Sequence, residues 1–184
     1  MMKTTGGSAI LDSVAILEKV KIKERMKVAD FGCGSYGHFV FPAAKMVGSK
    51  GTVYAIDILK PVLESVVKRA KQENLPQIKA VWSDIEVFNA TKIETESLDI
   101  GMIINNLYMS KRRAEMMREC LRMVKKGGKL LIIEWEDSSS PFGPPPEARV
   151  KAESLKNAAG KLNLKFLESF VAGQFHYGLV FEKL

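Results

Sequence analysis

The sequence predicts an α/β fold with a mostly parallel, doubly wound, seven-stranded sheet, an antiparallel last strand and helices on both faces. Three observations support this prediction. Short apolar runs alternate with segments of helical periodicity, which is typical of a parallel sheet covered by helices. The runs 100–104 and 130–133 are continuously apolar, as expected for strands buried on both faces. The last two runs, 164–172 and 175–183, are joined by Gly173 and Gln174 alone, so the last strand runs against its neighbour.

The first half of the chain is expected to supply three strands and three helices. Strands are predicted over 27–31, 52–56 and 78–82 from their apolar runs. A first helix is predicted over 8–20, with Ser8 as its N-cap. A second covers 39–47, with Pro42 in its first turn, where the missing N–H costs nothing. A third begins at Pro61 and is closed by the sequence Asn74-Leu75-Pro76.

The second half is expected to continue the alternation. Strands are predicted over 98–104 and 129–135, separated by a basic helix that ends at Gly127 and Gly128. A proline-rich loop over 138–146 leads into a helix over about 147–160. The two terminal strands complete the sheet.

The size and composition of the chain indicate one globular domain over 1–184. A length of 184 residues with 46% hydrophobic and 27% charged residues suits one well-buried core. We expect 1–24 to form an N-terminal helical segment and a candidate lid. No apolar run approaches the ~20 residues that a membrane span needs, and no signal-peptide core is present. The two cysteines, Cys33 and Cys120, make a disulfide framework improbable and favour a cytoplasmic location.

The net charge of +7 raises nucleic acid as a candidate partner. The densest basic stretch runs from residue 111 to 129. Its apolar positions, such as Met117 and Leu121, and its basic positions, such as Arg118 and Arg122, fall on different stripes of a helix. We interpret the basic stripe as a solvated face, because no aromatic residues are interleaved for stacking on bases.

The residues that follow the first two strands indicate a nucleoside-containing cofactor. In such a sheet, ligands bind outside the carboxyl ends of the strands. The first strand ends in the sequence Asp30-Phe31-Gly32-Cys33-Gly34-Ser35-Tyr36-Gly37. Its glycines allow a sharp turn and close approach to a ligand, and a helix N-terminus follows. Asp57 ends the second strand, where a carboxylate can accept hydrogen bonds from both ribose hydroxyls.

These residues resemble the motifs of class I S-adenosylmethionine-dependent methyltransferases, which have a Rossmann-like fold. The run 28–34 resembles their first motif, Asp57 the second, Ser83-Asp84-Ile85 the adenine-contacting element, 98–107 the fourth, and 124–130 the turn before the fifth strand. The likeness spans roughly 25–183 and is loosely closest to the quinone and arsenite methyltransferases. It implies S-adenosylmethionine as cofactor. It also implies a set of binding residues: Asp30, Gly32, Cys33, Gly34, Tyr36, Gly37, Asp57, Ile58, Asp84, Ile85 and Asn105.

The glycine spacing departs from that family. The loop has the spacing Gly32-x-Gly34-x-x-Gly37, which is typical of dinucleotide-binding folds, so an NAD(P)-dependent oxidoreductase is an alternative. Asp30 and the antiparallel last strand favour the methyltransferase. A non-catalytic S-adenosylmethionine-binding protein is a second alternative.

The sequence leaves the methyl acceptor, the acceptor atom and the oligomeric state open. We expect a small-molecule acceptor reached by in-line displacement, with RNA or protein as alternatives. A general base is needed only if the acceptor loses a proton, and no catalytic residue is assigned. The candidates for that base are Tyr36, His38, Tyr108, Glu134, Asp137 and His176. No cluster with metal-ligand spacing is present, so no metal is expected. Acceptor choice is expected to depend on the loop 137–146 and on the N-terminal helix.

Overall fold

The computed structural model describes residues 10–136 and 142–184. Seven strands form one sheet in the order β3-β2-β1-β4-β5-β7-β6. The strands are β1 (Lys27–Phe31), β2 (Thr52–Asp57), β3 (Ile78–Trp82), β4 (Leu98–Ile104), β5 (Val124–Trp135), β6 (Leu164–Gly173) and β7 (His176–Lys183). The pairs from β3 to β5 are parallel, whereas β7 is antiparallel to both β5 and β6. The predicted fold class, including its antiparallel last strand, is confirmed.

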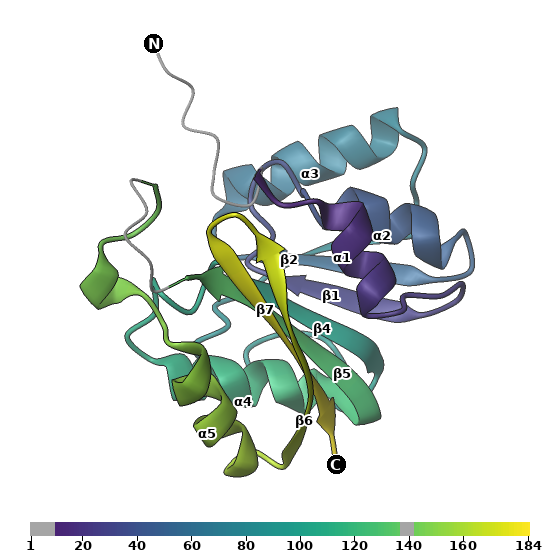
Figure 1. Cartoon of the computed structure of the whole chain (residues 1–184). Coiled ribbons are helices and arrows are strands. Elements are labelled where there is room, and N and C mark those ends of the chain that lie inside the picture. Colours follow the sequence, from purple (N-terminus) through teal and green to yellow (C-terminus); the bar gives the residue numbers. More distant parts are fainter. Residues whose placement is uncertain (1–9, 137–141) are drawn as a thin grey trace.

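Helices cover both faces of the sheet (Figure 1). The helices are α1 (Ser13–Lys19), α2 (Val40–Val47), α3 (Lys60–Gln72), α4 (Arg113–Met123) and α5 (Ala152–Gly160). A core that includes Val28 packs against α1, α2 and α3. Its neighbour Ala29 faces the opposite core, against α4 and α5. Alternate residues of a strand thus enter different cores, which explains the continuous apolar runs.

Two predicted helix starts are corrected by the structure. Helix α1 begins at Ser13, because the side chain of Asp12 accepts a hydrogen bond from Ala15 N at 3.0 Å and caps it. The predicted cap, Ser8, lies outside the described residues. The helix predicted from residue 147 begins at Ala152 and is preceded by a short 3-10 turn, Pro146–Ala148. The buried Arg149 separates the two, because it has an extended backbone and donates to the carbonyl of Glu136 at 2.8 Å.

The basic helix is shorter than predicted. It ends at Met123, because Val124 is extended and pairs with Leu98 of β4. The segment 124–128 therefore belongs to β5. The interpretation of Arg122 as part of a solvated face is wrong, since its side chain is only 9% exposed and is paired with Glu119.

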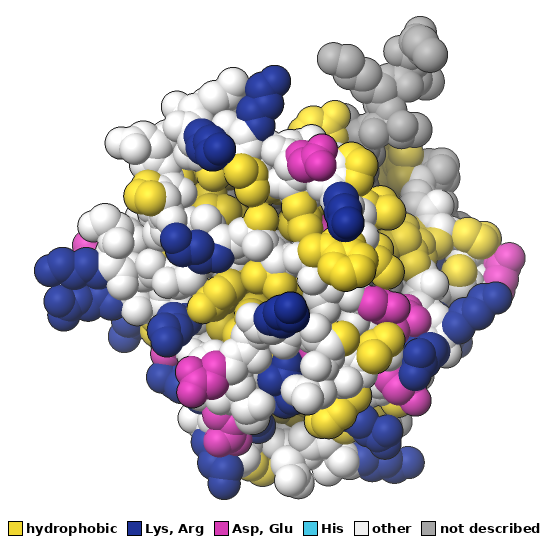
Figure 2. All heavy atoms as spheres, turned by 180° about the vertical axis from the view of Figure 1, so that it is seen from behind, with side chains coloured by type: hydrophobic (Ala, Val, Ile, Leu, Met, Phe, Trp, Pro, Cys, Tyr) yellow, Lys and Arg dark blue, Asp and Glu magenta, His cyan; other side chains and the backbone are white. Residues whose placement is uncertain are grey.

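Charged side chains are mixed over the face of the molecule that Figure 2 shows. Lys and Arg are spread across it and interrupted by acidic and hydrophobic groups. A site that follows a nucleic-acid backbone would need a continuous basic stripe. The Lys and Arg side chains form no such stripe on this face. None of the helices described is long and apolar enough to cross a membrane.

Candidate functional site

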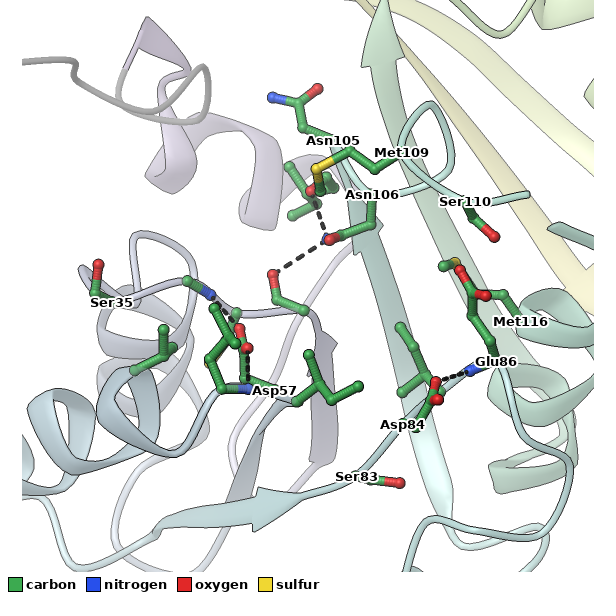
Figure 3. A pocket seen from close by; sticks show the side chains of 18 of the residues that line it. Ser35, Asp57, Ser83, Asp84, Glu86, Asn105, Asn106, Met109, Ser110 and Met116 are labelled. Atoms are coloured by element: carbon green, nitrogen blue, oxygen red, sulfur yellow. Dashed lines mark hydrogen bonds between the residues drawn. The ribbon is translucent and has the colours of Figure 1, made fainter. Parts of the chain in front are cut away.

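A cavity of about 750 Å³ opens at the carboxyl ends of β1, β2, β3 and β4 (Figure 3). This volume is typical of small-molecule sites. The strand order reverses between β1 and β4, and ligands bind at such a switch point in open α/β sheets. The cavity therefore lies where the sequence placed the cofactor.

The glycine loop after β1 is held by backbone hydrogen bonds. Gly32 N and Cys33 N both donate to the carbonyl of Ile56, each at 2.9 Å. Gly32 and Gly34 have φ of 80° and 64°, a region that glycine adopts without the strain of a Cβ atom. Apart from Gly34 and its two chain neighbours, no atom lies within 4 Å of the position that a Cβ of Gly34 would take. The loop thus presents open space at Gly34.

Asn106 supports the loop from β4. Its Nδ2 donates to the carbonyls of Phe31, Gly32 and Ile104 at 2.9, 3.1 and 2.9 Å. A Cβ on Gly32 would lie 2.4 Å from the Oδ1 of Asn106. Glycine at position 32 is therefore required by the close approach of this amide. Asn106 falls within the segment 98–107 that resembles the fourth motif, but it is not among the predicted binding residues.

Asp57 joins the glycine loop to the start of α3. Its Oδ2 accepts from Gly34 N at 3.1 Å, and its Oδ1 accepts from Leu59 N at 3.0 Å. The carboxylate is half-buried and lines the cavity. Asp57 thus has a structural role in the free protein and retains lone pairs for a ligand.

A second carboxylate faces the cavity from the end of β3. Asp84 Oδ1 accepts from Glu86 N at 2.9 Å, which closes a tight turn. Asp84 and Ile85 line the cavity on this side, and Ile58 lines it beside Asp57. Figure 3 shows Asp57 and Asp84 on different elements, with the cavity between them.

Asp30 lies behind the glycine loop and does not line the cavity. Burial and, secondarily, the charge of Asp57 raise its pKa to about 7. Gly37 also lies behind the wall, where a Cβ would collide with the ring of Phe41. The other predicted cofactor residues line the cavity. Burial raises the pKa of the Cys33 thiol, which disfavours its thiolate form.

The candidate bases fall into two groups. Tyr36, His38 and Tyr108 line the cavity, and His38 Nε2 donates to the carbonyl of Leu11 at 2.8 Å. Glu134 and His176 are fully buried and are not among the lining residues. Asp137 lies outside the described residues.

Several lining residues were missed by the sequence analysis. Ser83 and Asn106 sit next to residues that were assigned, so strand-end position was an available signal. Met109, Ser110 and Met116 come from the connection between β4 and α4 and its first turn, where no local pattern marks a ligand-facing side chain.

A family model described as a methyltransferase domain matches residues 22–176. The chain belongs to this methyltransferase family. The predicted class, a class I S-adenosylmethionine-dependent methyltransferase, is confirmed at the level of family and fold.

Three related proteins illustrate the similarity. The methyltransferase is 29% identical over 112 residues to a 2-phytyl-1,4-naphtoquinone methyltransferase of Nostoc punctiforme, covering 61% of this chain and 47% of that protein. It is 42% identical over 60 residues to an aklanonic acid methyltransferase of a Streptomyces species, covering 33% and 27%. The matches thus span less than half of either relative. The fold matches a SAM-dependent methyltransferase from Aquifex aeolicus with a TM-score of 0.85 at 21% identity, covering 95% and 91%.

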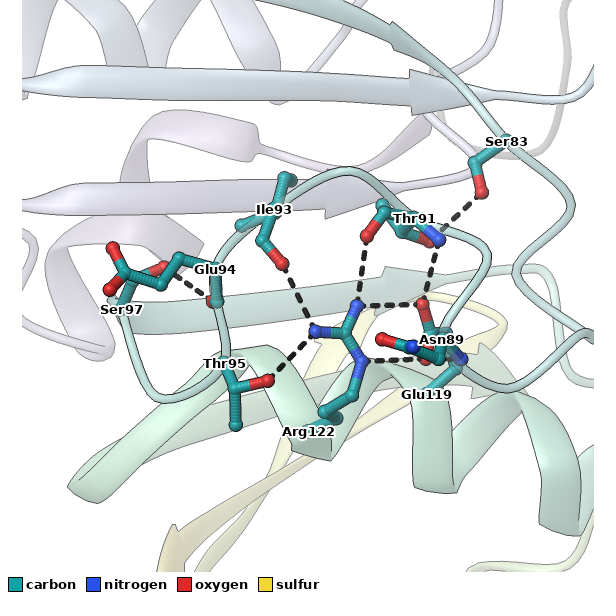
Figure 4. A network of polar contacts seen from close by, with 9 residues as sticks. All are labelled: Ser83, Asn89, Thr91, Ile93, Glu94, Thr95, Ser97, Glu119 and Arg122. Carbon is teal, nitrogen blue, oxygen red and sulfur yellow. Dashed lines mark hydrogen bonds and ion pairs between the residues drawn. The ribbon is translucent and has the colours of Figure 1, made fainter.

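A buried ion pair of the methyltransferase fixes the cavity wall behind Asp84 (Figure 4). Glu119 on α4 is fully buried, and its carboxylate pairs with Arg122 at 2.9 Å. The same carboxylate accepts from Asn89 N and Thr91 N at 2.6 and 2.9 Å. The Thr91 hydroxyl in turn lies 2.9 Å from that of Ser83, which lines the cavity. The network therefore anchors the loop between β3 and β4.

We predict that Glu119→Gln destabilises the methyltransferase by about 3–5 kcal/mol, because it leaves Arg122 unpaired in a buried site. Urea denaturation measures the change. The matched control is Glu153→Gln, which removes a pair with the same i,i+3 spacing from an exposed position and is expected to cost under about 1 kcal/mol. Equal losses of unfolding free energy in both variants would contradict the assignment of Glu119 and Arg122 as a buried ion pair.

The same network predicts a pH dependence. The hydrogen bonds from Arg122, Thr91 and Asn89 outweigh burial and lower the pKa of Glu119 to about 2 from an ordinary 4.5. As pH falls, Glu119 is protonated in the unfolded chain before it is protonated in the folded chain. The stabilisation that the ionised Glu119 contributes is therefore present above about pH 4.5 and is lost towards pH 2. The stability difference between wild type and Glu119→Gln should shrink over that window.

We further predict that Asp57→Asn lowers the pKa of Asp30 below about 7, because one of the two causes of its elevation is removed. Carboxyl carbon NMR measures this titration. Between the ordinary pKa of 3.8 and about 7 the unfolded chain is ionised at Asp30 and the folded chain is not, so this group makes stability fall as pH rises. An unchanged Asp30 titration in the variant would refute the coupling.

Proposed function

We propose that the methyltransferase transfers a methyl group from S-adenosylmethionine to a neutral small-molecule acceptor by in-line displacement. The observation that carries this proposal is the charge of the cavity. Three carboxylates line it, those of Asp57, Asp84 and Glu86, and the described lining residues include no Lys or Arg. S-adenosylmethionine carries a sulfonium and an ammonium cation, whereas the pyrophosphate of NAD(H) is anionic. A cavity of this charge therefore favours the methyl donor over the dinucleotide.

The residues of the cavity fit the parts of this cofactor. Asp57, with lone pairs beyond those used by Gly34 N and Leu59 N, suits the two ribose hydroxyls. Ile58 and Ile85, from the ends of different strands, suit the two faces of the adenine. Asp84 retains an oxygen to accept the exocyclic amine, since Glu86 N occupies the other.

The methionine end of the cofactor suits the glycine loop. The open space at Gly34 admits a ligand close to the backbone, and Gly32, Cys33 and Tyr36 line the same wall. Asp30 lies behind this wall and contributes negative charge when it ionises, while Gly37 shapes the loop. Asn105 completes the wall from the end of β4.

Methyl transfer from a sulfonium depends mainly on the alignment of the acceptor with the methyl group. A sulfonium is already a good leaving group, so the protein's task is to hold the acceptor in line with the methyl and to exclude water. Tyr36, His38 and Tyr108 line the cavity and stay the candidate bases for an acceptor that must lose a proton. Glu134 Oε1 accepts hydrogen bonds from Leu107 N and Tyr108 N, and this supports a structural role for it.

A small molecule is the acceptor that the surroundings favour. Both curated relatives carry the names of small-molecule methyltransferases, and the cavity has the volume of a small-molecule site. An RNA acceptor would require the exposed basic residues of the α4 region, which do not line the cavity. A protein acceptor has no supporting feature in the described structure.

A screen with tritiated S-adenosylmethionine over quinones, phenols, RNA and protein separates these classes, and binding without turnover across the screen would favour a non-catalytic binder.

We predict that Asp57→Ala weakens S-adenosylmethionine binding by about ten- to a hundred-fold, because hydrogen bonds to a charged partner contribute about 1.5–3 kcal/mol each. Isothermal calorimetry measures the affinity, with S-adenosylhomocysteine and NADH as comparison ligands. The wild type should bind both adenosyl ligands and bind NADH far more weakly.

Asp99→Ala is the matched control for this prediction. Asp99 lies at the opposite end of the sheet, where its Oδ2 accepts from Lys27 N at 2.7 Å. Both variants lose a strand-end carboxylate that holds a backbone N–H, so both should lower the melting temperature, but only Asp57→Ala should lose affinity. Preferential binding of NADH, or equal affinities in the two variants, would overturn the proposed function.

A further inference from the structure

The described residues with buried, unpartnered side-chain polar atoms gather at one end of the sheet. These atoms are Asn105 Oδ1, Glu134 Oε2, Trp135 Nε1 and His176 Nδ1. They come from the carboxyl ends of β4 and β5 and from the start of β7. A buried polar group without a partner costs about 1–3 kcal/mol. Such groups are rare in folded proteins, so a cluster of them calls for a specific explanation.

Three of the four residues form a connected array. Asn105 Nδ2 donates to His176 Nε2 at 3.1 Å. The amide nitrogen can only donate, so His176 Nε2 is the acceptor and the ring proton lies on Nδ1. Burial lowers the pKa of His176 to about 4, which keeps the ring neutral. The ring of Trp135 packs on it with centroids 4.1 Å apart, so the orientation of the imidazole is set from two sides.

Glu134 belongs to the opposite face. It precedes Trp135 on β5, so its side chain points to the other side of the sheet. Its Oε1 accepts from Leu107 N at 2.7 Å, which holds the connection after β4. Asn105, Trp135 and His176 therefore form a unit of their own, which we call the strand-end array.

Asn105 is the member of this array that reaches the cavity. It lines the cavity, and its backbone has φ of 53°, a conformation that few side chains other than Asn and Asp adopt readily. Figure 3 shows its side chain turned away from Asp57 and Asp84, the carboxylates of the proposed cofactor half. Its amide nitrogen is taken by His176, and its Oδ1 has no partner and is shielded from water.

We propose that Asn105 Oδ1 selects the acceptor by accepting a hydrogen bond from a hydroxyl group of a neutral aromatic molecule, and that His176 is a positioning residue that holds the amide in this orientation. This inference rests on the proposed function, since it assigns the acceptor end of the same cavity. Because water does not reach Oδ1 in the free protein, a bound hydroxyl gains the hydrogen bond without displacing a water from it. A ligand reaches Oδ1 only when the side chains that cover it move, and the flexible side chain of Met109, 60% exposed and lining the same cavity, is a candidate for this movement.

The other lining residues define the class of acceptor. Tyr108 and Met109 present an aromatic and a thioether group, which favour contact with a planar ring. The described wall supplies no Lys or Arg to pair with an anionic acceptor. A hydroxyl-bearing, uncharged ring satisfies the unpartnered carbonyl of Asn105, whereas the corresponding methyl ether leaves it unsatisfied.

Matched pairs of probes test the proposal. The probes are 1-naphthol, 2-naphthol and 4-phenylphenol, each with its own methyl ether, titrated calorimetrically into protein saturated with S-adenosylhomocysteine. We expect at least one hydroxyl probe to bind wild type about tenfold or more tightly than its ether. In Asn105→Gly, which keeps the backbone conformation, the hydroxyl probe and its ether should bind with about equal affinity. Asn163→Gly is the matched control, because Asn163 has the same φ of 53° in an exposed position outside the cavity, and it should keep the full preference.

Variants of His176 test its positioning role. His176→Leu removes the acceptor for Asn105 Nδ2 and should lose most of the preference, whereas His176→Gln supplies an amide oxygen in its place and should recover part of it. Binding of S-adenosylhomocysteine should stay within about twofold in both, which shows that the site is folded. Equal binding of hydroxyl probes and ethers to wild type, or an unchanged preference in Asn105→Gly, would overturn this inference. Failure to bind S-adenosylhomocysteine would instead overturn the proposed function.

Discussion

The close approach of Asn106 to Gly32 is the constraint on which the rest of the site depends. One side-chain amide donates to carbonyls at the ends of both β1 and β4, so the two strands are held together where the strand order reverses. This contact is possible because residue 32 has no Cβ. With that edge fixed, Asp57 orients the glycine loop from the other side through Gly34 N. The cavity is thus shaped by the protein's own hydrogen bonds before any ligand binds.

The interior strands were predictable and the helix ends were not. The bounds of the interior strands β1 and β4 agree with the sequence prediction, because continuous apolar runs report burial on both faces. The edge strand β3 also has its predicted bounds, although most of its residues are exposed. The end of α4 depends on the pairing of Val124 with Leu98, and the start of α5 depends on the contact of Arg149 with the carbonyl of Glu136. Both causes lie in distant segments, which local periodicity cannot report.

The site shows the same division between local and long-range information. The glycine loop and the strand-end acids Asp57 and Asp84 carry local patterns, and the structure places them around one cavity. The burial of the Glu119–Arg122 pair was missed, because the loop that contacts it lies about thirty residues away in the chain. The strand-end array was also missed, since Asn105 and His176 lie 71 residues apart in the sequence and meet through the order of the sheet.

The central claim is that a carboxylate-lined cavity in a chain of net charge +7 is the S-adenosylmethionine site. A crystal structure of the complex with S-adenosylhomocysteine tests it most directly. We expect the ribose hydroxyls within hydrogen-bond distance of Asp57, the adenine between Ile58 and Ile85, and the methionine end against the backbone of Gly34. A ligand bound away from this cavity, or a ribose without contact to Asp57, would contradict it.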